Sequence, residues 1–100
     1  IVLNDTSITT GRLIAIVNDN NFNRVNNASV WLYVSFEDLE RNLPVFRIET
    51  DGNGRADFGF VNTGNYYLRA FANRNGNTIR DTAATQVIAR KTIERNLVLR

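Results

Sequence analysis

The chain is 100 residues long, 43% hydrophobic and 22% charged, with a net charge of +2, which suits one globular domain better than a disordered chain. It has no Cys and no His, which excludes disulfides, thiolate or imidazole metal sites and the common nucleophilic triads. No apolar run approaches the roughly 20 residues of a membrane-spanning helix. We expect an N-terminal extension at residues 1–10 and a single domain at residues 11–100.

Short segments follow in which apolar and polar residues mostly alternate, which is the period of a β-strand. In one of them the side chains expected to face a core are those of Val30, Leu32, Val34 and Phe36. Turns rich in Asn and Gly separate the segments, and one helical turn is expected at residues 37–44, ended by Pro44. The predicted strands are residues 12–18, 29–36, 45–50, 55–61, 65–73, 82–89 and 92–99.

About seven short strands with almost no helix predict an all-β fold, an antiparallel β-sandwich. The order of features also resembles a known family. The match is carried by Thr-Asp-x-x-Gly, an aromatic strand and Gly-x-Tyr-x-Leu, here Thr50, Asp51, Gly54, Phe58, Phe60, Gly64, Tyr66 and Leu68. Over residues 11–99 the chain resembles the carboxypeptidase regulatory-like domain of the prealbumin (transthyretin) type.

The resemblance implies a prealbumin-like sandwich with Greek-key, immunoglobulin-like architecture, in which the second strand and the Tyr-bearing strand are neighbours in one sheet. It also implies an accessory module of a secreted or cell-envelope protein, and hence an extracellular, periplasmic or cell-surface location. Hydroxyisourate hydrolases share the fold but would need histidines, which this chain lacks. We therefore expect no enzymatic activity and no catalytic residue.

The stretch "ETDGNGRADFGF" at residues 49–60 looks most like a ligand loop. An EF-hand loop starting at Asp51 would need Gly at its sixth position, where this chain has Ala56. A looser cation site could use Asp51, Asn53 and Asp57, but turn chemistry alone explains these residues. We expect a tight hairpin that needs Gly54 for its backbone geometry, and no metal or cofactor.

Clusters of charge are expected to be solvated surface. The acidic cluster Glu37, Asp38 and Glu40 lies on a connection with no evident cleft, so it does not predict a glycosidase. The C-terminal residues 79–100 hold five basic and two acidic residues, but no aromatic residue stands among them. Because single-stranded nucleic acid is usually held by basic residues interleaved with aromatic ones, we expect no nucleic-acid partner.

The strongest functional hypothesis concerns one face of the sandwich. In the strands at 29–36 and 65–73, every second side chain is expected to face the core, so the others point outward. These outward side chains form an aromatic face of Trp31, Tyr33, Tyr67, Arg69 and Phe71. Exposed aromatic faces usually mark a partner.

Three interpretations of this face stay open. The face could pack against another domain, a second copy of the chain, or the N-terminal segment and the 37–44 connection. It could instead stack on sugar rings. A one-residue bulge could also reverse the inside and outside of one strand. We expect a structural or interaction module with a protein partner, a neighbouring domain or a homo-oligomer; the alternative is a carbohydrate-binding module.

Overall fold

The computed structural model describes residues 9–100, so most of the expected N-terminal extension lies outside the described part. The first strand already begins at Thr10, beside the boundary expected from the sequence. The elements are β1 (Thr10–Asp19), β2 (Ser29–Tyr33), α1 (Phe36–Arg41), β3 (Phe46–Glu49), β4 (Arg55–Asn62), β5 (Gly64–Arg74), β6 (Asn77–Val87) and β7 (Thr92–Leu99).

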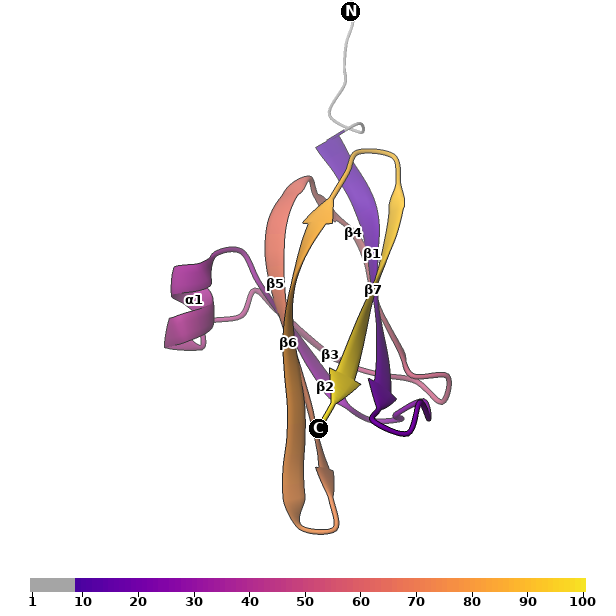
Figure 1. Cartoon of the computed structure of the whole chain (residues 1–100). Helices are drawn as coiled ribbons and strands as arrows, with labels where there is room; N and C mark the ends of the chain where they lie inside the picture. Colours follow the sequence, from indigo (N-terminus) through magenta and orange to yellow (C-terminus); the bar gives the residue numbers. More distant parts are fainter. Residues whose placement is uncertain (1–8) are drawn as a thin grey trace, which may run out of the picture.

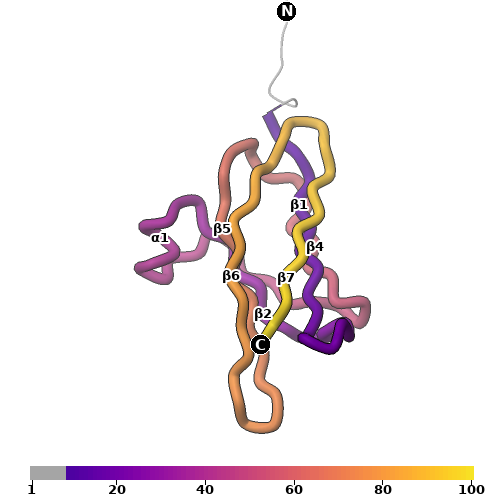
Figure 2. Tube along the Cα trace, viewed as in Figure 1, coloured from indigo at the N-terminus to yellow at the C-terminus, as the bar shows by residue number. Residues whose placement is uncertain are grey.

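The strands form two sheets that face each other, with α1 on the outer side of one of them (Figure 1). One sheet has the order β4-β1-β7 and the other the order β3-β2-β5-β6. The predicted all-β sandwich is therefore confirmed, as is the expected pairing of β2 with β5. The pairing is antiparallel throughout except between β1 and β7, which run parallel. The tube in Figure 2 shows the β5–β6 hairpin running past the ends of the other strands.

The core lies between the sheets and follows the alternation of the sequence. The central strand β1 contributes Leu13, Ala15 and Val17, which are fully buried. β2 and β5 face them with Val30, Leu32, Leu68 and Ala70, each 0% exposed. Burial of these side chains is the main favourable contribution to folding. Among residues 9–100 no helix has the length and apolarity to cross a membrane.

The strand expected at residues 29–36 ends early, at Tyr33, because the helix α1 begins at Phe36. The hydroxyl of Ser35 accepts a hydrogen bond of 3.0 Å from the backbone N–H of Asp38, which is the N-cap geometry of a helix. The predicted helical turn is thus confirmed, but Pro44 does not end it. Asn42 ends it, in the left-handed conformation with φ 57° and ψ 50°.

This early end corrects two core predictions. Val34 and Phe36 were expected to face the core with the rest of β2, but they are 47% and 56% exposed. They lie after the last residue of the strand, where the two-residue period no longer applies.

A β-bulge in β4 reverses the expected direction of Phe60. The pairing of β1 with β4 shifts between Leu13 and Ile14, which leaves Phe58 as an extra residue. Beyond the bulge Val61 is buried, whereas Phe60 is 75% exposed. The predicted alternation of this strand therefore holds only as far as the bulge.

The strand β6 is displaced from the expected range 82–89 because a tight hairpin joins it to β5. Asn75 and Gly76 both have positive φ, 54° and 83°, and the pair Arg74 and Asn77 closes the turn. Two such residues in a two-residue loop are typical of the turn whose twist matches the flanking strands. Pairing therefore starts at Asn77, five residues before the expected start.

Gly54 has the role expected from the sequence. Its φ is +72°, and a Cβ built on it would lie 2.7 Å from the carbonyl oxygen of Val17. Its own carbonyl accepts a hydrogen bond of 2.8 Å from the Val17 N–H. The 51–54 turn is therefore held against β1 at a distance that only glycine permits.

We predict that Gly54→Ala lowers the free energy of unfolding by about 1 to 3 kcal/mol, because alanine would be strained at positive φ and would clash with Val17. The matched control is Gly52→Ala in the same turn, where no atom lies within 4 Å of the new Cβ. It should change stability by no more than about 0.5 kcal/mol. Urea denaturation of both variants measures the difference, and equal stabilities would contradict the assignment.

Candidate functional site

The structure brings all five residues of the predicted aromatic face onto the outer side of the β3-β2-β5-β6 sheet. Trp31 lies directly opposite Arg69, and Tyr33 lies directly opposite Tyr67. Phe71 lies opposite Ser29 on the same side. They share one face because their neighbours in sequence fill the core. Their role in binding stays a prediction.

The face is not exposed throughout, and this corrects the expectation for Tyr33. Its side chain is 0% exposed because the segment around α1 folds back over it. The phenolic hydroxyl donates a hydrogen bond of 2.7 Å to the Oδ1 atom of Asn42. Burial raises the pKa of Tyr33, and the nearby positive charge of Arg69 partly offsets this rise.

Two further contacts hold α1 on the sheet. The Arg69 guanidinium lies 5.5 Å from the centre of the Tyr33 ring and donates to the Leu39 carbonyl at 3.5 Å. The rings of Phe36 and Tyr67 pack edge to face, with centroids 5.9 Å apart. The 37–44 connection, one of the expected alternatives, thus covers half of the aromatic face.

The other half stays open beside α1. Trp31 and Phe71 are half-buried and pack edge to face, with ring centroids 5.0 Å apart and an interplanar angle of 81°. The guanidinium of Arg47 lies 4.9 Å from the centre of the Trp31 ring, a cation–π contact. Next to these rings is a hollow of about 220 Å³ whose lining residues are Trp31, Asn42, Arg69, Phe71, Thr78 and Arg80.

Sequence reasoning missed three residues of this hollow. Asn42 was read as part of a connection, and it reaches the site because it ends α1. Thr78 and Arg80 belong to the part of β6 that was not predicted. The signal was present, since Thr78, Arg80 and Thr82 alternate with Ile79 and Ala83, but the predicted strand begins only at residue 82.

In the loop at residues 49–60, Asp51 holds the turn together through hydrogen bonds to the backbone. The Oδ1 atom of Asp51 accepts hydrogen bonds from the backbone N–H groups of Asn53 at 2.8 Å and Arg55 at 3.1 Å. These bonds, that of Arg55 first, hold the pKa of the Asp51 carboxyl below its usual value. Asp19 makes the same pattern, with N–H groups two and four residues on.

Asp57, the third residue of the looser cation site considered from the sequence, has other partners than Asp51. Asp57 pairs with the Arg12 guanidinium and accepts from the N–H of Gly59, and both contacts lower its pKa. The oxygens of Asp51 and Asp57 are therefore engaged with different partners. Among residues 9–100 no group of three His, Cys, Asp or Glu side chains could hold a metal ion.

A second opening lies between the free edges of β3 and β4. Four large apolar side chains are exposed there, with Phe60 at 75% and Phe46 at 51%. They border a hollow of about 310 Å³ lined by Val34, Val45, Phe46, Phe60, Val61, Asn62 and Tyr66. The bulge in β4 and the early end of β2 together produce this apolar surface.

No family model and no curated protein matches the chain. Among solved structures, the chain is similar to the Bacillus anthracis TIE protein, with a TM-score of 0.66 and 16% identity over 91% of this chain and 16% of that one. It is also similar to a "putative carbohydrate binding protein" from Pseudomonas aeruginosa, with a TM-score of 0.61 and 18% identity over 93% of this chain and 90% of that one. At these identities the likeness shows a shared fold.

We predict that the two outward rings of β2 differ in their effect on stability. Tyr33→Ala should lower the free energy of unfolding by about 3 to 5 kcal/mol, because it leaves a cavity under α1. Trp31→Ala should cost less than about 2 kcal/mol, because its ring is partly exposed.

Urea denaturation of both variants tests this division of the face. Tyr33→Phe is the matched control, since it removes only the hydrogen bond to Asn42 and should cost about 1 kcal/mol. A loss for Trp31→Ala as large as that for Tyr33→Ala would show that Trp31 belongs to the fold and would remove it from the site.

Proposed function

We propose that this domain is a non-catalytic binding module that holds carbohydrate in the hollow beside Trp31 and Phe71. The observation that carries the proposal is the composition of that hollow. Two aromatic rings lie next to the planar polar groups of Asn42, Arg69 and Arg80. A sugar ring presents an apolar C–H face and an edge of hydroxyl groups, so it matches such a lining.

The hollow is also prepared in advance for a ligand. The guanidinium of Arg47 lies over the Trp31 ring, and Phe71 packs against the same ring. Asn42 is fixed by the Tyr33 hydroxyl at 2.7 Å. Side chains held in this way lose little conformational entropy when a ligand binds, which favours affinity.

Two further points support the proposal. The similar structure from Pseudomonas aeruginosa is described as a "putative carbohydrate binding protein", and the two chains match over nearly their full lengths. The resemblance to carboxypeptidase regulatory-like domains supports an accessory module of a secreted or cell-envelope protein. Under this proposal the domain tethers or orients a larger protein on a glycan, and it does not itself catalyse a reaction of that glycan.

Binding of the purified domain to a glycan array tests the proposal. We expect binding to at least one class of glycan, and a loss of at least tenfold in affinity for Trp31→Ala and for Phe71→Ala, because each removes a ring that contacts the sugar. Phe22→Ala is the control, since Phe22 is 84% exposed in the β1–β2 connection, away from the hollow. Binding that persists in Trp31→Ala and Phe71→Ala would place the ligand elsewhere.

A second candidate function is contact with another copy of the chain through the apolar opening between β3 and β4. The observation that favours it is the pair of exposed rings, Phe46 and Phe60, beside two strand edges that carry no partner within residues 9–100. Free edges of identical strands can pair across a two-fold axis, and the apolar rings would be buried in the same contact.

Sedimentation equilibrium over a range of concentrations tests this second function. We expect a concentration-dependent dimer, and we expect Phe60→Asp to abolish it, because a charge would then have to be buried in the contact. Phe22→Asp is the control for an added charge at an exposed ring. A monomer at every concentration, or a dimer that survives Phe60→Asp, would contradict this contact.

A further inference from the structure

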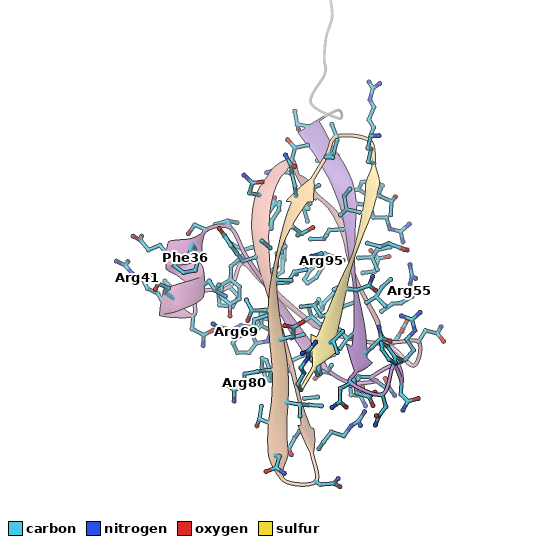
Figure 3. All side chains as sticks on the ribbon, in the orientation of Figure 1. Phe36, Arg41, Arg55, Arg69, Arg80 and Arg95 are labelled. Carbon is cyan, nitrogen blue, oxygen red and sulfur yellow. The ribbon has the colours of Figure 1, made fainter. Side chains whose placement is uncertain are left out.

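Three arginines surround the aromatic pair at the open half of the face. Arg47 and Arg69 lie directly opposite Trp31 on its two neighbouring strands, and Arg80 lies directly opposite Phe71. Arg69 and Arg80 project on the side of the sheet that carries α1 (Figure 3). The hollow is therefore bordered by positive charge next to the two rings.

These three guanidinium groups have no carboxylate partner among residues 9–100. Four other arginines do pair with a carboxylate within 4.0 Å, namely Arg12, Arg41, Arg55 and Arg74. Arg69 instead donates to two neutral oxygens, at 3.4 Å to Asn42 and at 3.5 Å to Leu39. Within the described residues, the side chain of Arg80 makes no hydrogen bond or ion pair, so its donors are available to a ligand.

The lining of the hollow contains two of these arginines and no acidic residue. A guanidinium group offers paired N–H donors that match a carboxylate or a sulfate. We infer that the carbohydrate is anionic, with a carboxylate or sulfate held by Arg69 and Arg80 while Trp31 and Phe71 contact the sugar ring. This inference rests on the proposed carbohydrate site.

The geometry favours an anionic sugar over a single-stranded nucleic acid, which also combines rings with negative charge. Trp31 and Phe71 already pack against each other at 81°, so no space for a stacked base lies between them.

Calorimetric titration with two matched pairs of polymers tests the inference. The pairs are polygalacturonate with its fully methyl-esterified form, and dextran sulfate with dextran. We expect at least one charged polymer to bind about tenfold tighter than its neutral counterpart and to weaken as salt is raised. The first pair reports on carboxylate and the second on sulfate.

The Arg80→Gln variant assigns the effect to the hollow. It should lose about tenfold in affinity for the charged polymer and clearly less for the neutral one, because glutamine keeps a polar N–H group but not the charge, and the Arg80 side chain has no hydrogen bond or ion pair within residues 9–100 to lose. The control is Arg90→Gln in the β6–β7 turn, which removes the same charge elsewhere and should leave both affinities unchanged.

The possible failures can be told apart. Equal binding of charged and neutral polymers, lost in Trp31→Ala, would overturn the inference and leave the carbohydrate site standing. Binding that survives Trp31→Ala and falls equally in Arg80→Gln and Arg90→Gln would be general charge attraction. It would overturn both the anionic ligand and the carbohydrate site. An oligothymidylate is titrated as a nucleic-acid probe beside the polymers. If it binds tighter than every polymer, the ligand of the hollow is a nucleic acid and not a sugar. Binding of none of these polymers would also overturn the inference.

Discussion

The register of β2 against β5 is the constraint on which the rest of the structure depends. In this register Leu32 lies opposite Leu68 in the core, and Trp31 therefore lies opposite Arg69 outside. A shift of β5 by one residue would bring Arg69 into the core and expose Leu68. The cost of burying an unpaired charge makes such a slip prohibitive. The apolar core thus determines which side chains meet at the candidate site.

The N-cap at Ser35 divides the face that this register creates. By ending β2, it turns the chain out of the sheet and lets α1 fold back over Tyr33, while Trp31, one alternation earlier, stays open. The Asn42 that ends the helix then supplies a polar wall to the hollow. One short helix of six residues therefore both completes the fold over one ring and shapes the site beside the other.

The sequence was sufficient for what depends on local pattern. Alternation identified the strands of the core, and the Asp-Gly and Asn-Gly residues of the loop at 49–60 correctly indicated a turn that needs Gly54. It was insufficient where one local rule overrides another. The alternation of residues 29–36 continues through Ser35, but the N-cap at Ser35 ends the strand before it. The bulge at Phe58 likewise turns Phe60 outward, and the only sequence signal for it is the adjacent Gly59. Arg80 was missed because its strand was predicted to begin at residue 82, although the alternation starts earlier.

Charge is distributed differently over the two outer faces of the sandwich. On the β4-β1-β7 sheet, Arg12 pairs with Asp57 and Arg55 with Glu94, and both acidic residues lie opposite Ile14 in the register of the sheet. An anion arriving there would have to displace a carboxylate already in place. On the other sheet Arg47, Arg69 and Arg80, which lie around Trp31 and Phe71, have no carboxylate partner among residues 9–100. An anion gains most binding energy beside a cation that has no partner. The distribution of charge therefore favours anion binding on the outer face of the β3-β2-β5-β6 sheet and not on that of the β4-β1-β7 sheet.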